Sequence, residues 1–125
     1  MEDKVIYEDN GYVMSVEALY CVGGYITYDI AISCCGFSGE CNFCIAENAL
    51  AKYIKKINYM LDALKGEVEI SDSESDAYLK AYFEDSMNFY MKGQIGGSYE
   101  DNTLKFKMKA DQTLLQGLKD KLLDY

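Results

Sequence analysis

The chain has 125 residues, of which 50% are hydrophobic and 26% are charged. This length suits one domain, and this balance excludes the low-hydrophobicity, high-charge composition of disordered chains. The sequence contains no His, Pro, Trp or Arg. Without an imidazole base or a guanidinium fork, most hydrolase and phosphotransfer mechanisms are excluded. We therefore expect a single domain over residues 1–125 that is not an enzyme, with no catalytic residues, no cofactor and no metal.

The net charge is −9, because 12 lysines stand against 21 acidic residues. Such a chain repels nucleic acid and anionic lipid and attracts basic proteins. We expect a basic protein partner, no direct contact with nucleic acid or membrane, and a monomer or a homodimer. Residues 1–6 lack the basic and apolar run of an export signal, and the five cysteines are an odd number. These two features predict reduced thiols and a cytoplasmic location.

Alternation of apolar and polar residues dominates the first third of the chain and indicates half-buried antiparallel strands. These strands are expected at residues 12–20, 26–34 and 37–45. The parity of the apolar positions shifts at Cys35-Gly36, which locates a turn. A two-residue loop there places Cys34 opposite Phe37, and every apolar residue of the two strands then lies on one face.

Helical periodicity replaces the alternation between Glu47 and Lys65, and Gly66 is placed to end this helix in the left-handed conformation. A second helix is capped by Asp111 and runs to Leu122. Further strands are expected at residues 68–70, 79–83, 87–95 and 104–110. These elements predict an α+β fold, with a predominantly antiparallel sheet of about seven or eight strands and two amphipathic helices packed on one face.

The segment from Glu67 to Asp85 carries the densest negative charge, with seven acids against Lys80 alone. Tyrosines in and after this segment alternate toward the solvent side of the predicted strands, and tyrosine is enriched in protein interfaces. Together these features predict the contact surface for a basic partner. The expected partner-binding residues are Asp72, Glu74, Asp76, Tyr78, Tyr82, Glu84, Asp85, Tyr90 and Tyr99.

Simpler interpretations stay open for several of these features. A solvated loop accounts for residues 71–76, which lack the glycine and the distal glutamate of an EF-hand, and aromatic residues suit strands in general. The lysines of the last strand protect it from edge-to-edge pairing. Cys41 and Cys44 form a C-x-x-C, but residues three apart in a strand point to opposite faces. We interpret them as structural cysteines rather than a redox or zinc pair.

Three short segments are similar to segments of the WapI-type immunity family and its bacterial relatives, namely Phe37-Ser38-Gly39, Phe43-Cys44-Ile45 and Asp111-Gln112-Thr113. In that family a similar strand leads into an amphipathic helix, and a later strand ending in D-Q-T-x-L precedes a final helix. The resemblance in layout covers nearly the whole chain. It implies a protein that neutralises a secreted or contact-delivered toxin encoded beside it, and it assigns no functional residues.

We therefore expect a noncatalytic immunity protein that neutralises a basic toxin by direct binding. A phage-type inhibitor that imitates nucleic acid to block a host defence nuclease has the same acidity, and it predicts that DNA or RNA competes for the partner. A third alternative is a small enzyme that uses Cys44 or a lysine as nucleophile. That alternative requires a lowered thiol pKa at Cys44.

Overall fold

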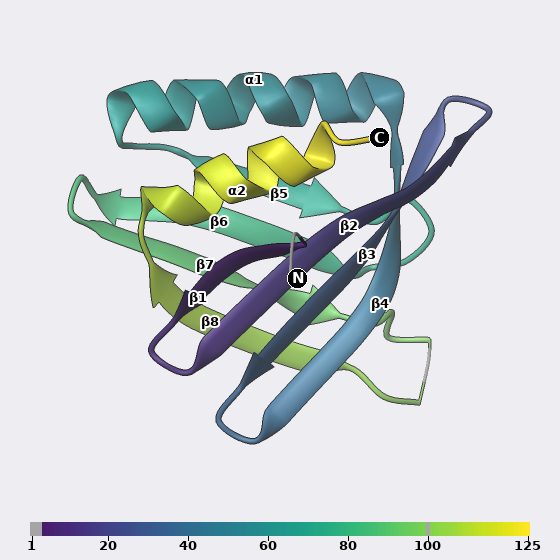
Figure 1. The fold of residues 1–125 in the computed structure, drawn as a ribbon, viewed down its shortest axis with the longest axis horizontal. Coiled ribbons are helices and arrows are strands. Elements are labelled where there is room, and N and C mark those ends of the chain that lie inside the picture. Colours follow the sequence, from purple (N-terminus) through teal and green to yellow (C-terminus); the bar gives the residue numbers. More distant parts are fainter. Residues whose placement is uncertain (1–3, 100) are drawn as a thin grey trace.

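Figure 1 shows the fold as a computed structural model, which describes residues 4–99 and 101–125. The chain forms two successive units, each with four antiparallel strands followed by one helix. The first unit comprises β1 (Val5–Asp9), β2 (Tyr12–Val22), β3 (Tyr25–Cys34), β4 (Phe37–Ala46) and α1 (Glu47–Ala63). The second comprises β5 (Glu67–Ser71), β6 (Tyr78–Asp85), β7 (Asn88–Ile95), β8 (Leu104–Ala110) and α2 (Gln112–Leu122). The α+β class is confirmed. Residues 1–3, on which the expected lack of an export signal partly depends, and residue 100 lie outside the described residues.

The eight strands form two separate sheets of four, not the single sheet expected from the sequence. The first sheet has the order β1-β2-β3-β4 and the second has the order β5-β6-β7-β8. Helix α1 separates them along the chain, and the strands of the two sheets run at a steep angle to one another in Figure 1. Alternation reveals which side of a strand is apolar, but it does not reveal which strand lies beside it. The break between the sheets therefore left no signal in the apolar pattern.

The register predicted for the β3–β4 hairpin is confirmed. Cys34 pairs with Phe37, and the buried Tyr28 pairs with the buried Phe43. The turn between the strands has φ of 58° at Cys35 and 85° at the following glycine. These two positive values fit the type I′ turn that matches the twist of a two-residue hairpin. The hairpin thus directs its apolar side chains to one face, as expected.

Two local details differ from the expectation. Strand β1 was not foreseen, although the turn that joins it to β2 is Asn10-Gly11, with φ of 53° and 82°. Asn-Gly is the strongest short signal for a hairpin. Helix α1 ends at Ala63, two residues before the predicted end at Lys65, because Leu64 takes the left-handed conformation and donates its N–H to Met60 O at 2.8 Å. Gly66 also has a positive φ, of 99°, but it lies beyond the cap.

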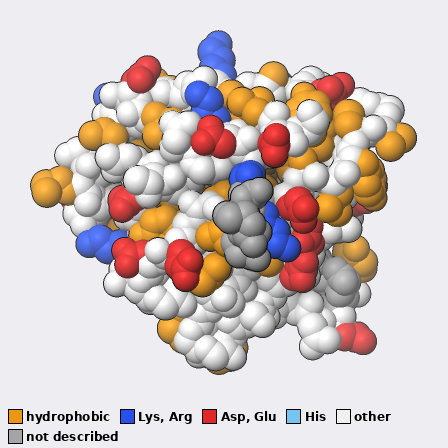
Figure 2. All heavy atoms as spheres, viewed as in Figure 1, with side chains coloured by type: hydrophobic (Ala, Val, Ile, Leu, Met, Phe, Trp, Pro, Cys, Tyr) orange, Lys and Arg blue, Asp and Glu red, His pale blue; other side chains and the backbone are white. Residues whose placement is uncertain are grey.

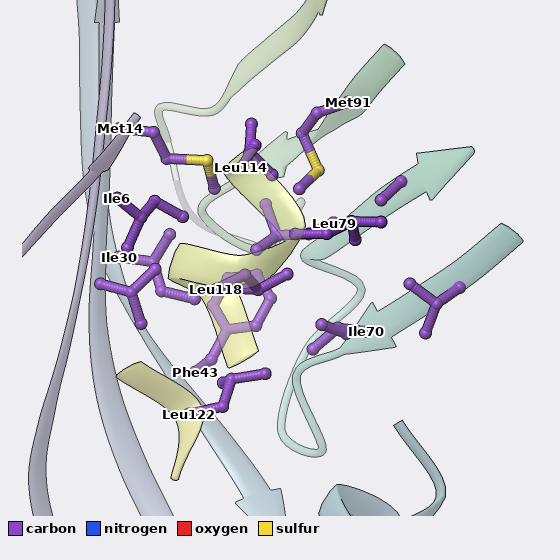
Figure 3. Packing of buried hydrophobic residues seen from close by; sticks show 14 of the residues in the cluster. Ile6, Met14, Ile30, Phe43, Ile70, Leu79, Met91, Leu114, Leu118 and Leu122 are labelled. Atoms are coloured by element: carbon purple, nitrogen blue, oxygen red, sulfur yellow. The ribbon is translucent and has the colours of Figure 1, made fainter. Parts of the chain in front are cut away.

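Helix α2 lies between the two sheets instead of sharing one sheet face with α1. Figure 3 shows its leucines pointing toward both sheets. The buried residues around the α2 leucines Leu114, Leu118 and Leu122 are Ile6, Met14, Ile30 and Phe43 from the first sheet and Ile70, Leu79 and Met91 from the second. Each fully buried leucine contributes about 1.5–3 kcal/mol of hydrophobic stabilisation. Residues from both units therefore contribute to one core.

The edge strand β4 also contacts the second unit directly. Its Cys44 donates its N–H to Asp72 Oδ1 and accepts at its carbonyl from Ser73 N, both at 2.9 Å. Farther along β4, Cys41 Sγ accepts from Gly96 N at 3.3 Å. These contacts hold β4 beside the loop between β5 and β6 and the loop after β7. The candidate site described next lies at this junction.

Candidate functional site

The nine predicted partner-binding residues do not form one surface. The acidic loop of residues 72–76 lies before β6, whereas Glu84 and Asp85 lie at the far end of β6. A strand rises about 3.3 Å per residue, so these two acidic groups are separated by roughly 20 Å or more. The continuous acidic surface that was expected from the local charge is therefore split between the two ends of one strand.

At the far end, Asp85 serves the turn between β6 and β7. It accepts hydrogen bonds from Met87 N at 2.9 Å and from the Asn88 side chain at 2.8 Å. The bond from Asn88 is the main reason that the pKa of Asp85 lies below its ordinary value. Glu84 beside it is exposed. These contacts give Asp85 a structural role in closing the hairpin.

Asp72, which was predicted as a partner contact, is a largely buried residue with a structural role. Its side chain is only 9% exposed. It accepts hydrogen bonds from Cys44 N at 2.9 Å, Glu74 N at 3.2 Å and Ser75 Oγ at 2.7 Å. A carboxylate in this position satisfies backbone donors that would otherwise be buried without partners. Asp72 therefore attaches the loop to β4.

Asp76 is exposed and holds the loop that carries Tyr99. It accepts from Ser98 N at 2.8 Å and from Ser98 Oγ at 2.6 Å, and the Gln94 amide donates to it at 3.2 Å. The hydrogen bond from the Ser98 hydroxyl is the largest cause of its lowered pKa. Tyr99, which directly follows Ser98, is 76% exposed. Asp76 thus positions an exposed aromatic side chain.

The tyrosines of the second sheet lie beside lysines as well as carboxylates, since Glu67 on β5 pairs directly with Tyr82. Tyr82 and Tyr90 are directly paired on β6 and β7, and their rings stack with centroids 5.6 Å apart. Lys92 Nζ lies 5.8 Å from the Tyr82 ring centroid, and Lys107 Nζ lies 5.0 Å from that of Tyr90. Tyr78 is half-buried on the same side of β6. Lysines therefore outnumber carboxylates around this tyrosine pair.

A hollow of about 470 Å³ lies where the outer side of β3 and β4 meets the β5–β6 loop. We call it the acidic cleft, because four carboxylates line it and none of the described residues in its lining is a lysine. Figure 2 shows acidic side chains, in red, gathered over this region of the first sheet, to the right of the centre. Three of the predicted residues contribute to it. The lining residues are Asp29, Glu40, Cys41, Asn42, Asp72, Glu74, Ser75, Gly97 and Tyr99.

Asp29 and Glu40 form a close carboxyl pair in the cleft. Asp29 on β3 pairs with Glu17 on β2, and Glu40 lies one diagonal step away on β4. Burial, followed by a hydrogen bond with Glu40 and repulsion by its charge, raises the pKa of Asp29 to about 6, against a smaller lowering effect of Lys4. A cation placed between these groups would favour their ionised forms. A positive charge bound in the cleft would therefore be stabilised by these carboxylates.

Sequence reasoning missed Asp29, Glu40 and Glu17, although a signal for them was available. The predicted β3–β4 register already placed residue 31 opposite Glu40, and so placed Asp29 diagonally beside it. The prediction of acidic sites depended on charge density along the chain. Charge density along the chain does not detect these carboxyl groups, because they are far apart in sequence and come together only across strands.

In residues 4–99 and 101–125, no group of three or more Cys, Asp or Glu side chains is arranged to hold a metal ion. Cys44 is half-buried in β4, where its backbone attaches the β5–β6 loop. At the β3–β4 turn, a hydrogen bond with Cys34 raises the pKa of Cys35, which reduces its thiolate fraction.

Comparisons with other proteins give no family for this chain. A scan against models of protein families finds no match. A search of curated proteins finds no match either. Within the part of the chain that the structure describes, neither helix has both the length and the apolar composition needed to cross a membrane.

Proposed function

We propose that the chain is a noncatalytic immunity protein that acts in the cytoplasm by holding a basic toxin, and that the acidic cleft receives a lysine or arginine side chain of this toxin. The observation that carries the proposal is the gathering of four carboxylates in one hollow with no lysine among its described lining residues. The net charge of −9 and the resemblance to the WapI-type immunity family support the same class of partner.

The shape and chemistry of the cleft suit a single anchoring side chain. Asp29, Glu40 and Glu74 supply carboxylates from three elements, and the exposed ring of Tyr99 supplies flat apolar area at the margin. A buried charged anchor beside an aromatic residue is a common arrangement at the centre of tight interfaces. The raised pKa of Asp29 supports the proposal further, because a cation would relieve the repulsion between Asp29 and Glu40.

The charge distribution favours one direction of approach. The outer side of the second sheet carries Lys80, Lys92 and Lys107 in adjacent positions and repels a basic partner. The carboxylates of β2, β3 and β4 attract it. Complementary charge of this kind accelerates diffusional encounter and makes the association rate depend on salt. A basic toxin would therefore approach the first sheet and the cleft beside it.

The test begins with affinity capture of the tagged protein from its native cell lysate at low salt, followed by mass spectrometry. The proposal predicts that one basic protein is captured in a stoichiometric complex. That protein must be toxic alone and must lose its toxicity when this chain binds it. Association rates are then measured for Glu40→Gln/Glu74→Gln and for a matched control, Glu69→Gln/Glu84→Gln, which removes the same charge from exposed positions outside the cleft lining.

The cleft variant is expected to bind several-fold more slowly and with a weaker salt dependence than the control. Equal rates for the two variants would remove the cleft from the proposal and leave only the general attraction by net charge. A captured protein without toxicity would contradict the immunity function itself.

The alternative of a nucleic-acid mimic is supported by the row of carboxyl groups that crosses β2, β3 and β4. Glu17 and Asp29 are directly opposite, and Glu40 continues the row diagonally. Neighbouring strands are about 4.8 Å apart, so the row presents closely spaced negative charges. This alternative predicts that the captured protein is a nuclease and that added DNA or RNA releases it. Retention of the partner in the presence of excess DNA would exclude the mimic.

A further inference from the structure

The outer side of the second sheet concentrates positive charge in an otherwise acidic protein. Five of the 12 lysines of the chain lie on this side of three adjacent strands, and the acids on the same side include Glu67 and Glu69 on β5 and Asp85 at the end of β6. We call this surface the lysine face. Its residues are Lys80 on β6, Lys92 on β7, and Lys105, Lys107 and Lys109 on β8.

Three of these lysines stand directly opposite one another. Lys80 pairs with Lys92, and Lys92 pairs with Lys107. Like charges in directly opposed positions destabilise a sheet. Protection of an edge does not explain the row, because Lys80 and Lys92 lie on the two interior strands of the sheet. Edge protection therefore does not offset the repulsion within the row.

Nearby carboxylates balance only part of the charge of the lysine face: Glu69 lies opposite Lys80, and Asp85 interacts with Lys109. The ion pair found among the described residues joins Lys80 Nζ to Glu67 Oε2 at 3.7 Å, with the Glu67 side chain 64% exposed. Lys92 and Lys107 lie over the rings of Tyr82 and Tyr90 instead. These ring contacts hold the ammonium groups in place without cancelling their charge. The surface is ordered and positively charged, as a binding surface for an anion would be.

We propose that the lysine face binds an extended, acidic segment of another protein. Alternate residues of an extended chain are about 6.7 Å apart, and Lys105, Lys107 and Lys109 repeat at this spacing along β8. A segment with an acid at every second position places its carboxylates in register with them. Single-stranded nucleic acid is a poorer fit, because the Tyr82 and Tyr90 rings already stack on each other and the net charge of −9 repels a long polyanion.

This surface is distinct from the acidic cleft and does not depend on the function proposed above. The lysine face belongs to the second sheet, whereas Asp29 and Glu40 belong to the first. A variant in one surface therefore leaves the charged groups of the other unchanged. The two proposals can fail independently.

The proposal is tested by fluorescence anisotropy at low salt with a labelled peptide in which glutamate alternates with serine. Lys92→Gln/Lys107→Gln is expected to weaken binding about fivefold, since each exposed ion pair contributes modestly. Lys52→Gln/Lys55→Gln, on the exposed side of α1, removes the same charge and is expected to bind as the wild type does. Lys92→Arg/Lys107→Arg keeps the charge and is expected to retain binding. Thermal unfolding of each variant verifies that it is folded.

A second peptide of the same composition, with its glutamates in one block, tests the spacing and is expected to bind more weakly. Equal affinity of the two peptides, equal loss in the two glutamine variants, or no binding by the wild type would overturn the proposal. Tighter binding of an oligothymidine would reassign the face to nucleic acid. Self-association of the free protein that Lys92→Gln/Lys107→Gln abolishes would reassign it to a second copy of the chain.

Discussion

Asp29 and Glu40 lie diagonally across from each other on β3 and β4, and the Glu40 carboxyl group contributes to the raised pKa of Asp29. Two carboxylates this close cannot both ionise without repulsion, so one of them retains a proton to higher pH than usual. The pair arises because the β3–β4 register places Glu40 diagonally beside Asp29. The repulsion within the pair lowers the stability of the fold at neutral pH. Groups with perturbed pKa values are concentrated at functional sites.

The pair predicts that stability falls as pH rises through the acidic range. Because the pKa of Asp29 is raised from 3.8 to about 6 in the folded chain, the native state binds this proton more tightly than the unfolded state does. The contribution of Asp29 to the free energy of unfolding is therefore most favourable below about pH 4, declines between about pH 4 and pH 6, and is constant above that range.

Asp29→Asn removes this titration. We expect it to flatten the decline and to raise the free energy of unfolding at neutral pH by about 1 kcal/mol, a value reduced for solvent screening at this half-buried position. Urea unfolding at about pH 4 and about pH 7 measures the effect, with Asp62→Asn on the exposed side of α1 as control. Parallel pH profiles for the wild type and Asp29→Asn would show that the pair does not titrate in this way.

Asp72 predicts a second, larger effect on stability. Asp72→Ala leaves three donors, Cys44 N, Glu74 N and Ser75 Oγ, without their acceptor. We expect a loss of about 2–3 kcal/mol in the free energy of unfolding. Glu74→Ala, at the exposed neighbouring acid, is expected to change it by less than about 0.5 kcal/mol. Urea unfolding of the two variants gives the comparison, and a near-neutral Asp72→Ala would contradict this structural role.

Tyr28 predicts a contribution from the hydrogen bond that joins β3 to the end of α2. The Tyr28 hydroxyl donates to Leu122 O at 2.5 Å in the core. Tyr28→Phe leaves this terminal helix carbonyl without its donor, and we expect a loss of about 1–2 kcal/mol. Tyr53→Phe removes a longer and exposed bond, from Ser71 N at 3.3 Å, and should cost less. Thermal unfolding of both variants tests the order, which a larger effect at Tyr53 would reverse.

The sequence was sufficient to predict what depends on neighbours along the chain. The two-residue turn at Cys35 fixed the β3–β4 register, and Asp111 caps α2 by accepting from Thr113 N at 2.9 Å, as expected. Tyr82 and Tyr90 were expected on adjacent strands and are directly paired. In each case a turn or a short pattern determines the outcome within a few residues.

Contacts between the two units could not be predicted in the same way. Asp72 is buried because the Cys44 N–H, 28 positions away in sequence, points at it. The tyrosine rings lie among lysines because the registers of β6, β7 and β8 bring Lys92 and Lys107 beside them. Charge density along the sequence reflects only the neighbours of a residue in the chain, and not its neighbours in the fold. The candidate site consists of residues that only the arrangement of the two sheets brings together.

Helix α2 approaches β1 closely at Gly117. Gly117 lies in the interior of α2, where alanine normally stabilises a helix by about 1 kcal/mol relative to glycine. Here a Cβ at position 117 would lie 2.9 Å from Ile6 O and 3.0 Å from Ile6 Cβ.

Ile6 O is a backbone atom of β1 and Ile6 Cβ is attached directly to that backbone, so neither can rotate away. The helix must therefore move away from the first sheet to accept a methyl group. This overpacking costs about 1–3 kcal/mol, so we expect Gly117→Ala to lower the free energy of unfolding by about 1 kcal/mol in spite of its better helix propensity. Gln116→Ala, at the exposed adjacent position, should be close to neutral. Urea unfolding provides the measurement. A Gly117→Ala protein more stable than the wild type would mean that the interface between α2 and β1 can relax, and that the position of α2 between the sheets does not depend on this glycine.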